Sequence, residues 1–344
     1  MNRTMWVIVL FSLHLFFLNA IAHGNGISGL PPSSRSSTLP LELAERVLSL
    51  DPNALSEGDV AEVMSHCPAP RILIFNGSVP IVTMESFARF LIRMGYPEER
   101  VRNAGNGSHT YSSYRSSKDV AGMIAWHYEN EGMRPVMIGH SQGGMLSVKI
   151  LHELAGTFGN GIAVLNPQTG RMEERHTIID PFTGQKRPVV GLKLGFASAI
   201  ATGKGMRLFL GQWNMLSHLR RIPDTVEDFT GFHLKSDLVS GTLFGLRQGD
   251  QYYPVGSAMV RNVTLPPECT HLGVPLTEDL AKDPEARGWI QSYTPSGVAP
   301  ELTPELRRNG KNILLAAELW YSIKKHWCTE LQRWTRIKGK LNRE

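Results

Sequence analysis

A serine between two glycines carries the clearest chemical content in this sequence: Gly139, Ser141 and Gly143 form the pattern Gly-x-Ser-x-Gly. A short apolar run that begins at Arg134 precedes the pattern, and residues with helical spacing follow it at once. This order predicts a strand, a sharp turn and a helix, which would lift a serine hydroxyl clear of the end of a sheet. We therefore predict that Ser141 is a nucleophile for acyl transfer.

A serine hydroxyl needs a base to remove its proton, and the base needs a carboxylate to orient it. After such an elbow the partners follow in the order acid, then histidine, each on a loop beyond a strand. His271 lies on a loop just beyond the last apolar strand and is the predicted base, although it could be a solvated loop histidine or pair with Glu268. The other histidines after the serine fall within expected helices, a strand or an insertion: His152, His176, His218, His233 and His326.

Asp237 is the predicted acid, because it follows the penultimate predicted strand and precedes His271 by 34 residues. Its neighbours, Lys-Ser-Asp-Leu-Val-Ser-Gly, indicate a tight loop that returns the side chain to the end of the sheet. The alternative acids are Asp224, Asp228 and Asp250, and each aspartate could instead form a turn or be solvated.

Attack on an acyl carbonyl creates an oxyanion, which two backbone N–H groups should meet. One predicted donor is Gln142, directly after the serine. The other is Ser78, with Val79 as second choice, in the turn Asn-Gly-Ser-Val that ends an early strand. Gly77 in that turn permits a close backbone approach, although the turn could also be an ordinary strand ending.

Alternating strands and helices set these residues in a scaffold. The pattern predicts a mostly parallel central sheet flanked by helices, which is an α/β fold. The predicted elements are strands at 71–75, 134–140, 162–167, 229–234 and 257–263, helices at 84–94, 117–131 and 142–154, and a hairpin at 176–190. Residues from 168 to about 228 are predicted to form a cap inserted over the elbow, or else an irregular extension packed elsewhere.

The N-terminal residues have the pattern of a secretory signal peptide. Arg3 supplies a positive charge, residues 6–18 are nearly all apolar, and Ala20-Ile21-Ala22 is a small-x-small cleavage pattern. The apolar run is shorter than the roughly 20 residues that span a bilayer. We predict cleavage after Ala22 and a secreted or periplasmic protein, with a membrane anchor as the alternative. Residues 23–40 are rich in Gly, Ser and Pro and predict a flexible lead-in to the main domain, at 41–310.

Charge and cysteine content exclude some classes of function. The chain has 344 residues and a net charge of +5, and its last 21 residues hold seven basic and two acidic side chains, so the excess gives no argument for nucleic-acid binding. Cys67, Cys269 and Cys328 allow at most one intrachain disulfide, whose pair the sequence does not select. No Cys or His spacing suggests a metal site. A glycan on the sequon at Asn76 would block the predicted site, which favours a bacterial protein; Asn106 and Asn262 are the other sequons.

A long helix is predicted from Lys311 onward, to the chain end at 344. Trp320, Trp327 and Trp334 recur every seven residues along one side, and basic residues occupy the other. The tryptophans could pack on the domain while the basic side is solvated, or they could contact an anionic membrane surface peripherally and so deliver a lipid substrate. Binding of a partner protein is a third alternative.

From Arg71 to Gly273 the sequence resembles the α/β-hydrolase superfamily, in particular its lipase and esterase branches. The resemblance is carried by Gly139-His140-Ser141-Gln142-Gly143-Gly144, by Asn76-Gly77 in place of the family's usual His-Gly, and by Asp237 and His271 in the expected order. It implies a Ser-His-Asp hydrolase of carboxylic esters, of acyl or lipid type, that works through an acyl-enzyme without metal or organic cofactor. An acyltransferase, an amidase, or a non-catalytic binding protein on this scaffold are the alternatives.

Overall fold

The structure, a computed structural model, describes residues 39–78, 83–203, 213–235, 237, 250–295 and 301–341. The predicted signal peptide and nearly all of the predicted lead-in lie outside these ranges. Among the helices within them, none has both the length and the hydropathy needed to cross a bilayer.

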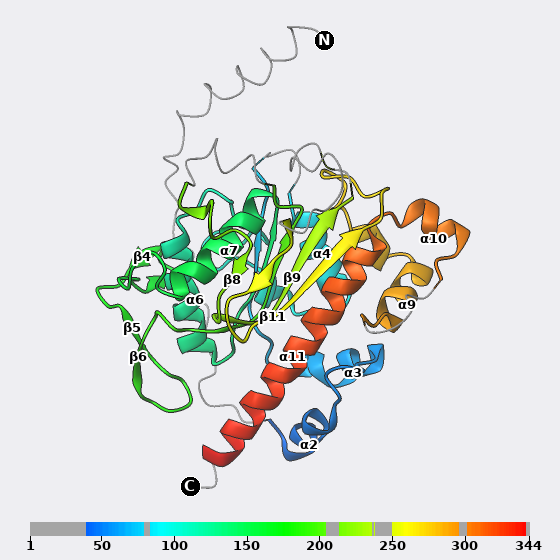
Figure 1. The fold of residues 1–344 in the computed structure, drawn as a ribbon. Helices are drawn as coiled ribbons and strands as arrows, with labels where there is room; N and C mark the ends of the chain where they lie inside the picture. Colours follow the sequence, from blue (N-terminus) through cyan, green and yellow to red (C-terminus); the bar gives the residue numbers. More distant parts are fainter. Residues whose placement is uncertain are drawn as a thin grey trace, which may run out of the picture. The chain divides into compact units, whose positions relative to one another are not determined.

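Five parallel strands form the central sheet, in the order β1-β2-β7-β9-β11 (Figure 1). The strands are β1 (Ile72–Phe75), β2 (Val136–His140), β7 (Leu194–Ile200), β9 (Val226–Leu234) and β11 (Met259–Leu265). Helices cover both faces, so the predicted α/β class with a mostly parallel central sheet is confirmed.

The two faces of the sheet belong to two hydrophobic clusters, because successive side chains of a strand point to opposite sides. In β1, Ile72 and Ile74 join one cluster, whereas Leu73 and Phe75 join the other. All four are fully buried, which explains why this strand is a continuous apolar run rather than an alternating one.

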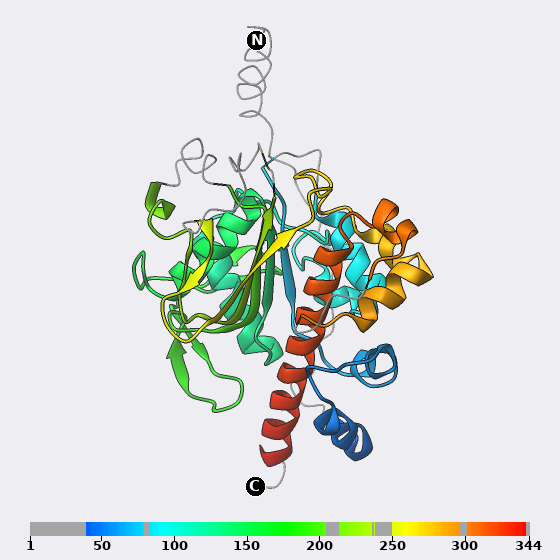
Figure 2. The same ribbon diagram turned by 45° about the vertical axis from the view of Figure 1, so that its right-hand side comes forward.

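Helices α6 and α7 pack on one face of the sheet, and α4 and α11 pack on the other (Figure 2). Ser116 caps the N-terminus of α6 by accepting a hydrogen bond from the N–H of Asp119, and Gly132 ends the helix with φ 72°. The helices are α2 (Leu41–Ser49), α3 (Glu57–Glu62), α4 (Glu85–Arg93), α5 (Glu98–Val101), α6 (Ser117–Glu131), α7 (Gln142–Leu154), α9 (Pro284–Ser292), α10 (Pro304–Asn309) and α11 (Ile313–Leu341), with short 3-10 turns η1 (Met64–His66), η2 (Trp213–Met215) and η4 (Glu278–Ala281).

Two predictions about the middle of the chain are wrong. Ile162 to Pro167 does not form a strand of the central sheet; only β3 (Leu165–Asn166) is extended there, and it pairs antiparallel with β4 (Arg171–Met172). The predicted cap at 168–228 contains β7, which lies in the central sheet between β2 and β9, so this range cannot be one insertion. The predicted hairpin is present as β5 (Thr177–Ile179) and β6 (Lys186–Pro188), and β8 (Arg221–Ile222) pairs with β10 (Tyr253–Pro254).

Helix α11 is part of the core. Trp320 and Trp327 are fully buried and Trp334 is 5% exposed, all within the cluster on its face of the sheet. The indole N–H of Trp327 donates to the carbonyl of Pro68 at 3.0 Å. The tryptophan stripe therefore packs on the domain, as the first alternative proposed, and a membrane contact by this helix would have to use its other side.

The predicted basic face of that helix is only partly solvated. Lys325 pairs with Asp228, at 3.0 Å between Nζ and Oδ2, and Lys324 is buried. Arg333 pairs with Glu330 on the same helix.

The three cysteines are buried and none forms a disulfide.

Candidate active site

Ser141 sits at a sharp turn between β2 and α7. Its backbone angles, φ 55° and ψ −116°, lie in a region that residues other than glycine rarely adopt. The Ser141 N–H donates to the carbonyl of Ile200 at 2.7 Å, so the end of β7 holds the turn in place. Strain of this kind persists only where the surroundings impose it, and it is concentrated at functional sites.

Close backbone contacts around the turn leave room only for glycine at positions 139 and 143. A Cβ atom on Gly139 would lie 2.1 Å from the carbonyl oxygen of Gly143. One on Gly143 would lie 2.5 Å from the carbonyl oxygen of Phe75 and 2.6 Å from that of Asn76. All of these are backbone atoms, so a side chain at either position would push α7 away from the ends of β1 and β2.

We expect Gly143→Ala to lower the free energy of unfolding by about 3 kcal/mol, the upper end of the usual cost of overpacking. We also expect it to abolish any activity that depends on Ser141, because β1 and its following turn must move. Thermal unfolding and ester hydrolysis measure both effects. Gly161→Ala is the matched control, since a Cβ there meets no atom within 4 Å. Equal stability of the two variants would contradict this account of the elbow.

The structure brings the three predicted triad residues together. Asp237 Oδ2 lies 2.8 Å from His271 Nδ1, and His271 Nε2 lies 3.0 Å from Ser141 Oγ. Ser141, Asp237 and His271 are 6%, 4% and 8% exposed, which shields these hydrogen bonds from bulk water. Asp237 follows β9 and His271 follows β11, so both come from the carboxyl ends of parallel strands beside the elbow.

Two of the alternative acids, Asp224 and Asp228, have other partners. Asp228 is near the start of β9 and binds His326 Nε2 at 2.8 Å, whereas Asp237 lies beyond the other end of that strand. Asp224 accepts hydrogen bonds from the backbone of Ser257 and Ala258. Two of the other histidines also have partners elsewhere: His152 contacts the carbonyls of His218 and Arg221, and His233 contacts Asn262.

The turn after β1 lies against the nucleophile, as an oxyanion loop must. A Cβ on Gly77 would be 3.4 Å from the Cβ of Ser141. Ser113 Oγ donates to the carbonyl of Gly77 and Tyr114 Oη to that of Ser78, both at 3.1 Å. These bonds occupy carbonyl groups, and the Ser78 N–H donates to no other described residue.

The other predicted oxyanion donor is suitable for a different reason. Gln142 is the first residue of α7, so its N–H has no acceptor within the helix and lies at the positive end of the helix dipole. Val79, the second choice for the loop donor, lies outside the described residues. Whether Ser78 and Gln142 bind an oxyanion stays a prediction.

The side chain of Asn76 holds this turn in place. Its Nδ2 donates to Thr110 Oγ1 at 3.1 Å, and its Oδ1 accepts from the N–H of Met84 at 2.8 Å. The side chain thus connects the end of β1 to Thr110 and to Met84 at the start of α4. A glycan on this nitrogen would disrupt the contact with Thr110. Sequence analysis identified Asn76 only as a sequon and as a departure from a motif.

His140 is a site residue that the sequence analysis did not single out. Its ring centroid lies 4.8 Å from that of His271, and a Cβ on Gly77 would be 3.2 Å from its Nδ1. Burial lowers the pKa of His140 to about 3, and the adjacent His271 contributes in the same direction. The neutral ring of His140 therefore lies between the turn after β1 and His271, and it adds no positive charge next to His271. Its position directly before Ser141 was the available signal.

A cavity of about 370 Å³ lies between the start of α6 and helix α7. Gln142, the residue after Ser141, is part of its lining, whereas Ser141 is not, and Arg115, Lys118 and Lys149 contribute positive charge. Glu153 is the acidic residue of the lining, and one of its oxygens accepts a hydrogen bond from Ser117 at 2.7 Å. Among the described residues, no cluster of three or more His, Cys, Asp or Glu side chains is placed to hold a metal ion.

Comparison with known proteins adds little to this geometry. No protein-family model and no curated protein matches the chain. Among solved structures, an IroE-like serine hydrolase from Shewanella oneidensis aligns over 81% of this chain and 93% of its own, with 16% identity and a TM-score of 0.31. A likeness this loose carries no argument about chemistry, so the assignment of the site depends on its own contacts.

Proposed function

We propose that the protein is a serine hydrolase that cleaves carboxylic esters through an acyl-enzyme. The observation that carries the proposal is the hydrogen-bonded series from Asp237 through His271 to Ser141, built on a strained elbow. A binding protein would have no need of a buried histidine 3.0 Å from a serine at a strained turn, with a buried carboxylate orienting that histidine.

In the proposed reaction, His271 Nε2 takes the proton of Ser141 as its Oγ attacks the acyl carbonyl carbon. The resulting oxyanion would accept hydrogen bonds from the N–H groups of Ser78 and Gln142. His271 then protonates the leaving alcohol, and the acyl group remains on Ser141. Water, deprotonated by the same histidine, releases the acid and restores the serine. Asp237 keeps the proton of the imidazole on Nδ1 and stabilises the charged ring.

Hydrolysis of a panel of 4-nitrophenyl esters, from acetate to dodecanoate, tests the proposal. We expect turnover with release of the free acid, and product analysis in the presence of an added alcohol separates hydrolysis from acyl transfer. An anilide of the same acid tests amide cleavage. Absence of ester turnover together with absence of anilide cleavage and of acyl transfer would refute the proposed function.

Within the acyl esters that the sequence predicts, we propose a preference for substrates that carry a negative charge on the acyl chain. The support is the cavity beside Gln142, whose lining has three cationic side chains and one carboxylate. Arg115 and Lys118 have no carboxylate partner among the described residues, so their charge is available to a substrate. Cations at a cleft favour anionic ligands electrostatically.

The pair of mono-4-nitrophenyl adipate and 4-nitrophenyl hexanoate tests this preference, because the acyl chains match in length and differ in charge. We expect the double substitution Arg115→Gln and Lys118→Gln to lower kcat/KM about 10-fold for the adipate and less than 2-fold for the hexanoate, an effect that added salt should weaken. Arg46→Gln, on α2, is the control for loss of a surface charge. Equal losses for both substrates, or a higher kcat/KM for long neutral chains, would contradict the proposed preference and favour a lipid substrate.

We also propose that the protein is exported, on the strength of the charged start, apolar run and Ala-Ile-Ala pattern of its first 22 residues. N-terminal sequencing of the protein from the culture medium or periplasm is expected to begin at His23. A chain that retains residues 1–22 and sediments with membranes would instead support an anchor.

A further inference from the structure

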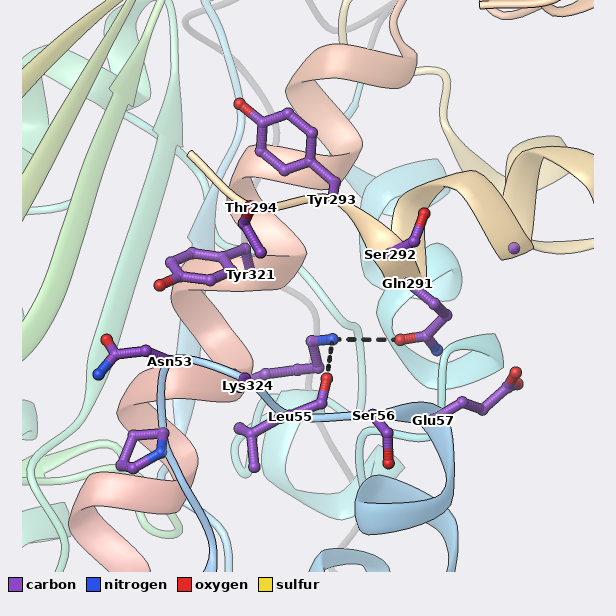
Figure 3. Close-up of a pocket in the computed structure, with 13 residues that line it drawn as sticks. Asn53, Leu55, Ser56, Glu57, Gln291, Ser292, Tyr293, Thr294, Tyr321 and Lys324 are labelled. Atoms are coloured by element: carbon purple, nitrogen blue, oxygen red, sulfur yellow. Dashed lines mark hydrogen bonds between the residues drawn. The ribbon is translucent and has the colours of Figure 1, made fainter. Parts of the chain in front are cut away.

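A second cavity of about 450 Å³ lies on the α11 side of the sheet, between the segment that joins α2 to α3, the end of α9 and the middle of α11 (Figure 3). It shares no lining residue with the triad or with the cavity beside Gln142. Its volume is within the range of small-molecule sites. The chemistry of its wall is therefore a separate question from ester hydrolysis.

One wall of this cavity holds a buried lysine. Lys324 is 3% exposed, and its Nζ donates to the carbonyl of Leu55 at 2.9 Å and to Gln291 Oε1 at 3.3 Å, as Figure 3 shows. Both acceptors are neutral. Burial lowers the pKa of Lys324 to about 8, so the ammonium group remains mostly charged at pH 7.

The neighbouring carboxylates are engaged elsewhere. Glu57 pairs with Arg287, at 2.6 Å, and Asp59 accepts hydrogen bonds from Ser56 in a capping box. Lys324 forms no direct ion pair with a described residue, although the charges of Asp59 and Glu57 raise its pKa against the effect of burial, and the Trp320 ring centroid lies 5.9 Å from its Nζ. A buried charge without a directly bound counterion is costly, and such charges in proteins are normally paired.

Gln291 adds a second unsatisfied donor to the same wall. Its Oε1 accepts from Trp320 Nε1 at 3.0 Å as well as from Lys324, which fixes the orientation of the amide. The Nε2 group is consequently directed away from both, and it is buried without a hydrogen-bond partner among the described residues. An N–H of the lysine and the amide N–H groups are thus left for an acceptor that none of the described residues supplies.

We propose that this cavity binds a small organic monocarboxylate. The carboxylate would accept hydrogen bonds from Lys324 Nζ and Gln291 Nε2, and the apolar body would lie against Leu55 and Tyr321, which also line the cavity. One ammonium matches one negative charge. A phosphate dianion would lack a second cation, because Arg287 is committed to Glu57.

Benzoate and its neutral analogue benzamide are suitable probes. Isothermal titration calorimetry at pH 7 measures the affinity of each probe for the full mature chain. We expect saturable binding of benzoate, at least 10-fold tighter than that of benzamide. Lys324→Gln should weaken benzoate binding at least 10-fold, whereas Lys325→Gln, a change of the adjacent lysine, and Ser141→Ala should not. Equal affinity for the two probes, or loss of binding in Ser141→Ala but not in Lys324→Gln, would overturn the proposal.

A pH series on the unmutated protein keeps the test valid if Lys324→Gln does not fold. Glu57 and Asp59 on α3 raise the pKa of the lysine, against the larger effect of burial, and burial raises the pKa of Tyr293 beyond α9 well above its usual range. Tyr321 on α11 also lines the cavity, and the series runs from pH 7 to pH 9. Because the free lysine has a pKa of about 8, benzoate should bind about 10-fold more weakly at pH 9 than at pH 7. A benzoate affinity that is constant between pH 7 and pH 9 would overturn the proposal. The proposed ester hydrolysis does not depend on either result, because the cavity shares no residue with the triad.

Discussion

Replacing Ser141 by alanine is expected to lower kcat for ester hydrolysis by about 10⁶-fold, the loss seen when a triad nucleophile is removed. The substitution deletes the atom that attacks the carbonyl and leaves the elbow glycines and the two predicted oxyanion donors in place. Thermal unfolding should change little, because only one oxygen is lost. Steady-state kinetics on the best ester of the panel, beside the melting temperature, give both quantities.

Ser147→Ala is the matched control for this experiment. Ser147 lies on α7 two turns beyond the nucleophile, and its hydroxyl donates only to the carbonyl of Gly143, at 3.1 Å. We expect its activity to stay within about twofold of the unmutated protein, since the lost bond is a supplementary one within a helix. Comparable activity of Ser141→Ala and Ser147→Ala would show that hydrolysis occurs elsewhere on the molecule.

The substitution Asp237→Asn is expected to lower kcat about 10⁴-fold at neutral pH with little change in structure. Asp237 Oδ2 accepts the Nδ1 proton of His271 at 2.8 Å. The amide of an asparagine can instead donate a hydrogen bond to Nδ1 of His271, which favours the tautomer whose proton is on Nε2. A protonated Nε2 cannot accept the proton of Ser141. Rates measured with the same ester and with protein of verified melting temperature test this role.

Asp228→Asn provides the comparison, because the sequence alone left Asp228 as an alternative acid. Asp228 is bound to Lys325 and His326 on α11, and those contacts lower the pKa of its carboxyl despite partial burial. We expect activity within about twofold of normal and a melting temperature lower by a few degrees. A larger loss of activity for Asp228→Asn than for Asp237→Asn would reverse the assignment of the acid.

The elements that build the elbow were predictable because local signals agree there. A buried apolar run, two glycines and a helical pattern predicted β2 and α7, and the helix at 142–154 has the bounds that were expected. The positions of Asp237 and His271 followed from chain order and from their places after strands. The structure places both in one hydrogen-bonded series with Ser141.

The central strand β7 was missed because four of its seven residues, in Leu-Gly-Phe-Ala-Ser-Ala-Ile, are glycine, alanine or serine. Glycine and alanine are depleted in strands, yet all seven residues are buried between two layers of helices. Small side chains are needed there: Gly195 lies against His326 of α11, and Ala199 packs near Gly144 of α7. Such requirements come from tertiary packing, which a sequence pattern does not display.

The tryptophan stripe of α11 could not be assigned from periodicity alone. An apolar stripe with basic residues opposite is equally typical of a helix on a core and of one on a membrane. The distinction depends on partners distant in sequence, such as Pro68 for Trp327 and Gln291 for Trp320. The same holds for Lys324, whose burial depends on a segment more than 200 residues earlier in the chain.

The most direct test of the central claim is the reaction of the purified mature protein with a fluorophosphonate, followed by peptide mass spectrometry. An activated serine attacks the phosphorus, whereas ordinary surface serines do not react. We expect one adduct, on Ser141, that is absent in Ser141→Ala and much slower to form in Asp237→Asn. An unlabelled Ser141 in folded protein, or labelling that is as fast in Asp237→Asn as in the unmutated chain, would contradict the proposed triad.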